Sequence, residues 1–408
     1  MNIHDLNIRN QPSPVNTAEL RNVNEWLIDG ARSVLDPQLA VAELCARLRG
    51  CGIPLWRVAM FVRTLHPHVV ARRFLWRPDT EVELEEYPFD SIDTGAFRNS
   101  PIAHIYATGD TIRRRLADPD CAIDFPILQD LRMEGVTDYL ASPLVFTYGE
   151  IQLATWTTRQ PGGFTDSQMA ALNSIITPLA RVAEIRALRR TAGNLLNTYV
   201  GTHAGERILA GQIRRGHTEA IHAAIWLSDM RGFTALIDRL PSQTLIDLLN
   251  SYFDCQVPAI HNRGGEVLKF MGDGLLAIFP LASDGTNARK ICNDALAAAC
   301  EAREKIVALS GSSGIHRFDE LRFGLALHLG EVLYGNIGGG NRLDFTCIGP
   351  AVNLAARIER LSGRLGRMIL ASDEFARHCA ADLLPVGNFT LSGFGAPRML
   401  FGLRDETL

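Results

Sequence analysis

Two aspartates, Asp229 and Asp273, each follow an apolar stretch that has the character of a β-strand. Asp229 comes just before residues 230–234, where a helix can begin, and Lys269 lies four residues before Asp273. Hard divalent cations prefer oxygen ligands, and two cations together can clamp the attacking and leaving oxygens of a phosphoryl transfer. If the two strands are neighbours in one sheet, the carboxylates meet at such a site. The free N–H groups of the helix start would then favour a phosphate.

Each aspartate also has a purely structural interpretation. The sequence Gly272-Asp273-Gly274 between two apolar runs is a hairpin signal without any chemistry. Asp229 could simply cap the helix that follows it. The hypothesis of a metal site therefore depends on the two aspartates taken together.

A second polar pair, Asn353 and Arg357, lies in a predicted helix over 350–362. The apolar residues of this segment form a buried stripe, and Asn353 and Arg357, four residues apart, share another face. Asparagine inside a helix is mildly unfavourable and calls for a reason. Arg357, Arg360 and Arg364 follow at helical spacing and would attract an anion. The alternative is an ordinary solvated face.

Four other features have a simple structural explanation when taken alone. Lys269 could simply lie on a solvated strand face, where lysine is common, although a lysine between two apolar residues near a metal carboxylate is less common; Thr346 could be an ordinary strand threonine. Residues 338–340 are three glycines, but no Lys-Ser/Thr follows them, so a hairpin tip is favoured over a phosphate loop. His66-Pro67-His68 is typical of a turn rather than of a metal or haem site.

The bulk composition narrows the class of protein. With 408 residues, two domains are expected, and 47% apolar residues suffice for ordinary cores. A net charge of -4 gives no support for a nucleic-acid or membrane-surface partner. Eight cysteines without C-x-x-C spacing indicate reduced thiols. We find no membrane-spanning run and no signal peptide, so we expect a cytoplasmic protein.

The chain divides into four predicted segments: a flexible lead-in over 1–21, a sensor domain over 22–180, a coupling helix over 165–202 and a catalytic domain over 203–408. The sensor domain should contain a hairpin over 56–63 and 69–76 and another over 138–147 and 150–157. The second domain should begin with a strand at 221–228, helices within 232–262 and a hairpin over 265–279. A helix at 286–309, strands at 321–334 and 342–348 and the helix at 350–362 follow. This order is typical of a ferredoxin-like or palm-type α+β fold.

The long helix over 165–200 carries two heptad-like apolar runs. The first is Leu172, Ile175, Leu179 and Val182, and the second is Ile185, Leu188, Ala192, Leu195 and Tyr199. The step between the runs is shorter than a heptad requires, like a stammer, and Pro178 could kink the helix. We interpret the helix as a parallel dimerising element that couples the domains. The alternative is an amphipathic helix packed on its own domain.

From about residue 199 to the C-terminus, the chain resembles the catalytic domain of class III nucleotidyl cyclases. The segments that carry the resemblance, by order and spacing, are 209–215, 227–234, 265–274, 330–337 and 344–357. The resemblance implies a homodimer with two Mg²⁺ or Mn²⁺ ions per site. It places metal ligands at Asp229, Met230 and Asp273, substrate-binding residues at Gly232, Phe233, Thr234, Lys269 and Thr346, and catalytic residues at Asn353 and Arg357.

The resemblance also implies the substrate. Lys269 matches the adenine-selecting lysine, which favours ATP, whereas guanylyl cyclases have Glu at that position and Cys at the second base position. The second position is usually Asp and here is Thr346, as in a bacterial subgroup of which some members respond to bicarbonate. Pro350 replaces an acid or Asn, and 391–394 lacks the late phosphate-binding lysine. Arg367 or Arg398 could replace it, or triphosphate affinity is lower.

The expected function is therefore an adenylate cyclase that makes cyclic AMP and is regulated by its N-terminal half. That half resembles GAF-like sensors by layout, with an unidentified small molecule or ion as effector. The alternatives are a catalytically weak nucleotide-binding regulator and a guanylate cyclase. A diguanylate cyclase lacks its Gly-Gly-Asp/Glu-Glu-Phe signature here.

Overall fold

The computed structural model describes residues 14–311, 322–340, 342–379 and 383–406, and the chain forms two compact units, Met1–Leu195 and Leu196–Leu408. The eight cysteines, all within the described ranges, are not joined in disulfides, as predicted. Across the described ranges, no helix combines the length and the apolar character needed to cross a membrane.

The N-terminal unit begins its ordered structure earlier than expected. We predicted a flexible lead-in over 1–21; residues 1–13 lie outside the described ranges, but α2 already starts at Thr17 and runs to Ile28. The Asn16 side chain caps this helix, since its oxygen accepts hydrogen bonds from the N–H groups of Ala18 and Glu19 at 3.1 and 3.2 Å. The prediction was wrong for residues 17–21 because the short cap was not recognised as a helix start.

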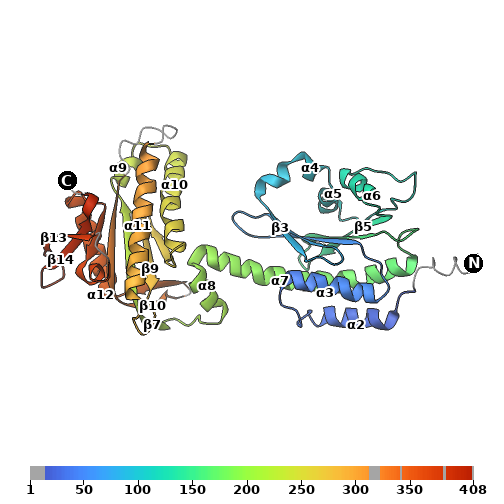
Figure 1. The fold of residues 1–408 in the computed structure, drawn as a ribbon, viewed down its shortest axis with the longest axis horizontal. Helices are drawn as coiled ribbons and strands as arrows, with labels where there is room; N and C mark the ends of the chain where they lie inside the picture. The colour runs from blue at the N-terminus through green and yellow to red at the C-terminus, as the bar shows by residue number, and fades with distance from the viewer. Residues whose placement is uncertain (1–13, 312–321, 341, 380–382, 407–408) are drawn as a thin grey trace, which may run out of the picture. The chain divides into compact units, whose positions relative to one another are not determined.

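A six-stranded antiparallel sheet in the order β3-β2-β1-β6-β5-β4 forms the centre of this unit (Figure 1). Both predicted hairpins are confirmed, as β1 pairs with β2 and β5 with β6. The strands are β1 (Arg57–Arg63), β2 (Ala71–Trp76), β3 (Glu83–Tyr87), β4 (Ile112–Arg114), β5 (Asp138–Val145) and β6 (Ile151–Thr158). His66-Pro67-His68 forms the expected turn between β1 and β2, where the His68 N–H donates to His66 Nδ1.

Helices cover both faces of this sheet (Figure 1). Because side chains alternate along a strand, Trp156 of β6 packs in the core beneath α2, α3 (Pro37–Gly50) and α7 (Asp166–Val200), whereas Leu153 packs in the core beneath α5 and α6. The helices on that second face are η1 (Phe89–Asp93), α4 (Gly95–Arg98), α5 (Pro101–Thr108) and α6 (Pro126–Met133).

Helix α7 runs without interruption through Pro178 to Val200, and the division between the units falls within it. Its first apolar run, expected to form a dimer seam, is instead buried in the core of the N-terminal unit. That part of the dimer prediction was wrong, because these side chains already have a partner surface on their own sheet. In the second run, Ile185, Leu188 and Tyr199 are 63%, 58% and 81% exposed, and a role in dimerisation stays a prediction.

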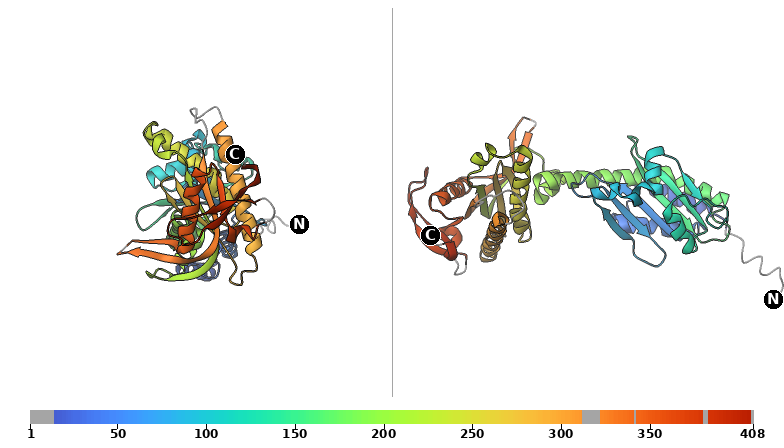
Figure 2. Two further views of the ribbon diagram at one scale, coloured as in Figure 1. Left: turned by 90° about the vertical axis from the view of Figure 1, so that its left-hand side faces the viewer. Right: turned by 90° about the horizontal axis from the view of Figure 1, so that it is seen from above.

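The C-terminal unit is an α+β fold, as expected, with strand order β13-β14-β12-β10-β7-β9-β8 and β11 paired to β10 (Figures 1 and 2). The strands are β7 (Thr218–Met230), β8 (Glu266–Met271), β9 (Gly274–Pro280), β10 (Phe323–Gly339), β11 (Arg342–Ile348), β12 (Ile369–Ser372), β13 (Leu383–Phe389) and β14 (Arg398–Leu403). The three glycines at 338–340 lie where β10 turns into β11, so the hairpin interpretation is confirmed.

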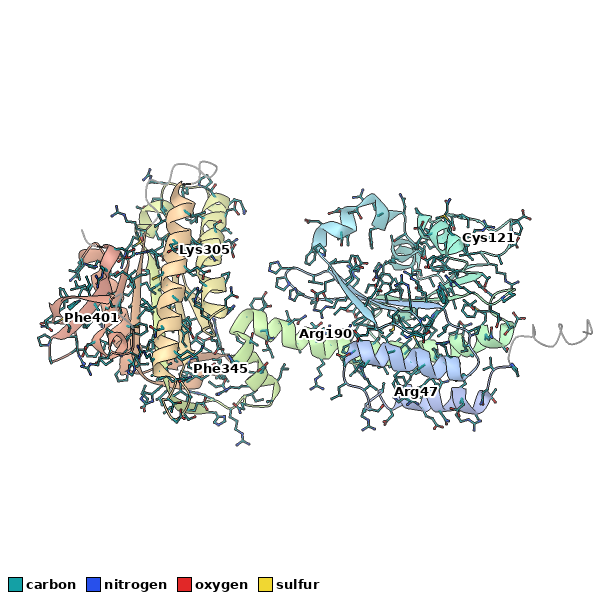
Figure 3. All side chains as sticks on the ribbon, in the orientation of Figure 1. Arg47, Cys121, Arg190, Lys305, Phe345 and Phe401 are labelled. Carbon is teal, nitrogen blue, oxygen red and sulfur yellow. The ribbon has the colours of Figure 1, made fainter. Side chains whose placement is uncertain are left out.

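The central strand β7 has a buried core on each face. Ala224 and Trp226 face the core that contains α10 and α11, whereas Ile225 and Leu227 face the core that contains α12. The helices of this unit are α8 (Thr202–Leu209), α9 (Phe233–Ile237), α10 (Ser242–His261), α11 (Ala288–Gly311), α12 (Pro350–Arg364), α13 (Asp373–Ala376) and η2 (Arg404–Glu406). Side chains occupy both sides of the sheets (Figure 3). The sheet is therefore held from both faces, which fixes its strand ends.

The buried ion pair of the N-terminal unit provides a test of this fold. Asp138 is fully buried; its Oδ2 lies 2.7 Å from Nη2 of Arg113 and accepts from the Phe164 N–H at 3.0 Å. We expect Asp138→Ala to lower the free energy of unfolding by about 3 kcal/mol, because Arg113 loses its buried partner. Urea denaturation of the full chain measures this.

Asp124→Ala is the matched control, because the Asp124 side chain is 40% exposed and that of Asp138 is buried, whereas their arginine partners are similarly exposed, at 28% and 25%. It should cost less than about 1 kcal/mol. Equal losses for the two variants would show that burial does not strengthen the Asp138 pair.

Candidate active site

The structure brings Asp229 and Asp273 together. Asp229 lies at the end of β7, and Asp273 lies in the two-residue turn between β8 and β9. Because β7 pairs antiparallel with β9, with Ser228 opposite Leu275, this turn is placed beside the end of β7. Asp273 is close enough to Asp229 for its carboxyl group to raise the pKa of Asp229. The sequence pattern predicted this juxtaposition, and the register of the sheet produces it.

The environment of Asp229 disfavours negative charge. Burial raises its pKa, and the charges of Asp273 and Glu359 raise it further, to about 7. A pair of carboxyl groups in this state requires either a shared proton or a cation. The position of Gly274 contributes to this crowding, because a Cβ there would lie 3.3 Å from Oδ1 of Asp229.

A buried ion pair next to the aspartates was not predicted from the sequence. Nη2 of Arg231 lies 2.7 Å from Oε1 of Glu359, and it donates to the Glu359 carbonyl oxygen at 2.8 Å. Burial raises the pKa of Glu359, which is 4% exposed, while Arg231 lowers it. The pair links the residues after β7 to α12. A carboxylate among the apolar positions of helix 350–362 was the signal that could have revealed it.

Glycine makes room for this arginine at two places. A Cβ on Gly324 would lie 1.8 Å from Nη2 of Arg231, and a Cβ on Gly363 would lie 3.1 Å from its Cζ. Gly324 is paired with Asp229 in the β7–β10 register. The ion pair therefore occupies a space that any larger residue at 324 would fill.

The segment after Asp229 offers backbone rather than side-chain groups. The Met230 side chain is 3% exposed and packs in the core, so only backbone atoms of this residue can reach a ligand. Gly232 has a φ of +74°, which favours glycine, and it leads into the short helix α9 at Phe233. The N–H groups at Phe233 and Thr234 belong to the first turn of α9, where no carbonyl of the same helix can accept from them.

Lys269 and Thr346 lie on strands that contact each other, β8 and β11. Burial raises the pKa of Cys347, next to Thr346, to about 11, while the nearby charge of Lys269 lowers it. Thr346 is 3% exposed, and its Oγ1 has no hydrogen-bond partner among the residues described. The neighbouring Phe345, labelled in Figure 3, packs edge-on against Tyr334 with ring centroids 4.8 Å apart. The two predicted base-binding residues thus lie in one region.

Asn353 and Arg357 do not face the aspartates within one chain. Both lie on α12, where Asn353 is exposed and Arg357 is partly exposed. At about 100° per residue, Arg357 is roughly 200° around the helix from Glu359, the residue that approaches Asp229. Asn353 lies about 120° from Glu359, so neither residue shares the side of α12 that carries Glu359.

The donor set fits divalent cations of the Mg²⁺ type. Such ions are usually held by one or two carboxylates together with substrate phosphates and water. Within the described part of the chain, no cluster of three or more His, Cys, Asp or Glu residues forms a complete metal cage. Asp229 and Asp273 supply the carboxylates, and their mutual repulsion favours a cation between them.

Comparison with known proteins identifies the C-terminal unit. Residues 217–379 match the family model described as the adenylate and guanylate cyclase catalytic domain. The C-terminal unit contains a class III cyclase catalytic domain. The matched range includes every residue predicted to bind metal, to bind the base or to act in catalysis, but not Arg398.

Two curated relatives are adenylate cyclases. A terminal-differentiation-specific adenylate cyclase of Dictyostelium discoideum is 34% identical over 137 residues, which are 34% of this chain and 6% of that protein. An adenylate cyclase of Anabaena cylindrica is 30% identical over 171 residues, 41% of this chain and 32% of that protein. The chain thus spans about a third or less of the length of these relatives.

Among solved structures, the adenylyl cyclase CyaB from P. aeruginosa is similar to this chain. It is 27% identical, with a TM-score of 0.42, and the match covers 47% of this chain and 100% of that one.

The raised pKa of Asp229 predicts how pH changes stability in metal-free buffer. Since the folded-state pKa, about 7, lies above the usual 3.8, the folded cyclase domain binds the extra proton between these values. We expect the free energy of unfolding to fall as pH rises from about 4 to about 7 and then to level off. Urea denaturation with EDTA, compared with Asp229→Asn, isolates this contribution.

Mn²⁺ added at pH 8 should restore stability in the wild type more than in Asp229→Asn, since cation binding requires the ionised carboxylate. In the metal-free experiment, the free energies of unfolding of the wild type and of Asp229→Asn could instead change in parallel between about pH 4 and pH 7. That result would contradict the raised pKa of Asp229.

Proposed function

We propose that the C-terminal domain is an adenylate cyclase that converts ATP to 3′,5′-cyclic AMP and pyrophosphate. The observation that carries the proposal is the paired carboxylates of Asp229 and Asp273 at adjacent strand ends, with a pKa near 7 at Asp229. Family membership of the domain supports cyclisation as the reaction.

In this proposal, Asp229, Asp273 and the Met230 backbone hold two divalent cations. Bound cations would lower the pKa of the ribose 3′-hydroxyl and neutralise charge on the triphosphate. The unpaired N–H groups at Gly232, Phe233 and Thr234 bind phosphate oxygens. Since Arg231 is engaged with Glu359, it orients the segment that carries these groups rather than binding substrate.

The base site favours adenine on chemical grounds. Lysine carries donors and no acceptor, and adenine N1 is an acceptor, whereas guanine presents an N1–H donor at that position. The unpartnered Oγ1 of Thr346 can accept a hydrogen bond from the adenine amino group. The Thr346 hydroxyl would thus be the hydrogen-bond acceptor in place of the usual aspartate, without adding a negative charge.

Asn353 and Arg357 act across a homodimer interface in this proposal. Their position on the side of α12 away from Glu359 leaves them unable to meet the aspartates of their own chain, but free to meet those of a second copy. Asn353 would orient the ribose, and Arg357 would stabilise charge developing on the α-phosphoryl oxygens. Two symmetric sites would result.

A catalytically weak nucleotide-binding regulator is the second candidate. The chain has Pro350 at the start of α12 and no lysine in 391–394. The two arginines considered as replacements are already engaged: Arg367 Nη1 donates to the Leu403 carbonyl at 3.0 Å, and Arg398 lies 2.8 Å from Glu374. These contacts favour weak triphosphate binding over replacement of the lysine.

We propose that the N-terminal unit is a GAF-like sensor that regulates the cyclase. Support comes from its separate sheet, its two cores and a cavity on one face of the sheet. Helix α7 connects this unit to the catalytic domain and offers the covalent route for regulation.

The base site predicts substrate preference. With Mn²⁺, kcat/KM for ATP should exceed that for GTP by roughly 10²-fold or more, because GTP would leave buried polar groups of the site unpaired. Lys269→Ala should lower kcat/KM for ATP by about 10–100-fold through loss of a charge-assisted hydrogen bond. Chromatographic measurement of both cyclic nucleotides decides this.

The control for this experiment is Lys290→Ala, which removes an exposed lysine on α11 and should leave both rates unchanged. Faster turnover of GTP would identify a guanylate cyclase. ATP binding without release of pyrophosphate would identify the non-catalytic regulator.

The shared site predicts complementation between inactive chains. Asp229→Ala and Asn353→Ala should each lose at least about 10²–10³ in rate. Mixing the two variants should restore about a quarter of wild-type activity, since half of the dimers are mixed and each mixed dimer keeps one intact site. Mixing Asp229→Ala with Asp273→Ala should restore nothing, because both changes lie in the same half of the site. Equal activities in the two mixtures would rule out shared sites.

A further inference from the structure

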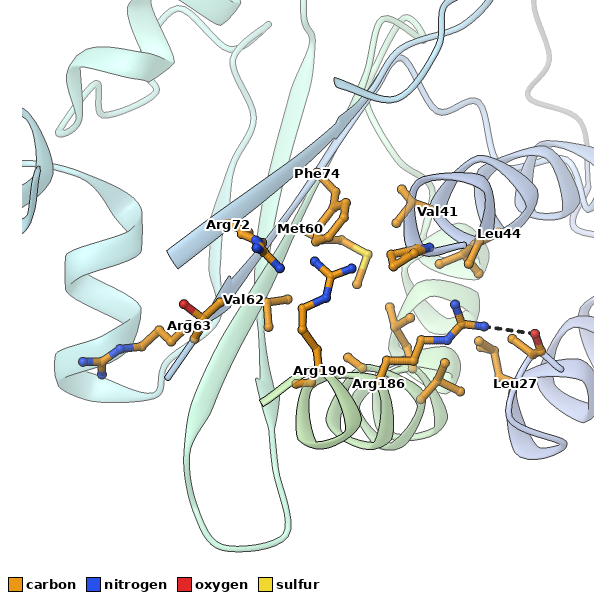
Figure 4. A pocket seen from close by; sticks show the side chains of 18 of the residues that line it. Leu27, Val41, Leu44, Met60, Val62, Arg63, Arg72, Phe74, Arg186 and Arg190 are labelled. Carbon is orange, nitrogen blue, oxygen red and sulfur yellow. Dashed lines mark hydrogen bonds between the residues drawn. The ribbon is translucent and has the colours of Figure 1, made fainter. Parts of the chain in front are cut away.

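The N-terminal unit contains a cavity between the β1–β2 hairpin and helices α2, α3 and α7 (Figure 4). The space open to the centre of a water molecule is about 100 Å³. Leu44, Met60, Phe74, Leu179 and Val182 form its apolar walls, and Ala183 and Ala187 leave room along α7. Benzene is bound by a cavity of about 150 Å³, so this smaller apolar space favours a slender alkyl chain over a ring.

One side of this apolar cavity is cationic. Figure 4 shows the guanidinium groups of Arg72, Arg186 and Arg190 directed towards it, whereas Arg63 points away. Arg72 is paired with Glu86, whose Oε1 lies 2.6 Å from its Nε. Arg186 donates to backbone carbonyls, including that of Ala31 at 3.0 Å. Two of the three arginines therefore have structural partners.

Arg190 and Asn194 have none. Arg190 makes no hydrogen bond or ion pair within the described ranges, and Nδ2 of Asn194 is buried without an acceptor. The two residues are four apart on α7, so they share one face of the helix. Burial lowers the pKa of Arg190, and the neighbouring charge of Arg72 lowers it further. The buried Nδ2 of Asn194 is costly to leave unpaired, and the partly buried Arg190 next to it carries a charge without an ion pair among the described residues; a ligand that bonds to both would offset these costs.

The charges around the cavity indicate the charge of the ligand. Arg72, Arg186 and Arg190 are positive, and the carboxylates that act on them are Glu86 and Asp36. This leaves an excess of one positive charge beside an apolar space. A single carboxylate would accept hydrogen bonds from both Arg190 and Asn194 and balance that charge.

We propose that this cavity binds a small amphipathic monocarboxylate, with its alkyl chain among the apolar walls and its carboxylate on Arg190 and Asn194. Both carboxylate-binding residues lie on α7 shortly before the division between the units at Leu195–Leu196. Binding would therefore order the last turns of α7 that belong to the sensor unit. Any effect on cyclase output rests on the function proposed above, but binding itself does not.

Octanoate is a suitable probe, because it combines one carboxylate with a flexible apolar chain. Isothermal titration calorimetry of the full chain should show one octanoate per chain. Arg190→Gln should weaken binding by about tenfold or more, as expected for loss of a charge-assisted hydrogen bond. Arg189→Gln is the matched control, since Arg189 is exposed on the neighbouring position of α7, and its affinity should equal that of the wild type.

Octan-1-ol and octylammonium have alkyl chains like that of octanoate but a neutral and a positive polar group. They therefore test whether binding depends on the negative charge or only on the apolar chain. Octan-1-ol should bind wild type and Arg190→Gln alike, and octylammonium should bind more weakly than octanoate. Ala187→Phe provides a second variant that acts by filling the cavity and should abolish octanoate binding. Circular dichroism melting confirms that each variant is folded.

Three results would overturn the proposal. They are no saturable octanoate binding, equal octanoate affinity in Arg190→Gln and the wild type, or octylammonium binding as tight as octanoate. The first would also be the outcome if side chains of a second copy fill the cavity. A chain without cyclase activity that still binds octanoate would contradict the proposed function while leaving this site intact.

Discussion

Repulsion between two carboxyl groups is the constraint around which the catalytic domain is arranged. The register of β7 against β9 holds Asp229 beside Asp273, and partial burial raises the cost of charging both. Such an arrangement is unfavourable in the absence of a cation or a proton. It is tolerated because cores on both faces of the sheet fix the strand ends, so the strain cannot relax by moving the backbone.

The same crowding of negative charge explains the arrangement of the residues around the aspartates. Glu359 adds a third negative charge near Asp229, and Arg231 neutralises it in a space kept open by Gly324 and Gly363. Helix α12 is thereby tied to the end of β7 through one of its faces. Its opposite face, with Asn353 and Arg357, is left for a partner. Helix α12 thus stabilises the end of β7 in its own chain and, in the proposed dimer, contributes catalytic residues to the site of the second chain.

Helix α7 also has two parts with different surroundings, here along its length. Its first half completes the core of the N-terminal unit, and its second half exposes apolar side chains such as Ile185 and Leu188. Arg190 and Asn194, whose donors have no partner among the described residues, lie within this second half. The stammer in the apolar pattern falls where buried contacts give way to exposed ones. A change of surroundings, rather than a defect in a coiled coil, accounts for it.

The sequence by itself determined β1, β2 and β5 to β11, the hairpins, the α+β order of the second domain and the position of both aspartates, because alternating apolar residues and glycine turns are local signals. It did not predict β3, β4 or β12 to β14. Tertiary structure decided what depends on distant contacts. It placed the Arg231–Glu359 pair beside the aspartates, turned Asn353 and Arg357 away from them, and buried the first run of α7 in its own core. It also enclosed the arginine-lined cavity. These features join residues far apart in the chain, and local patterns do not record which surfaces pack together.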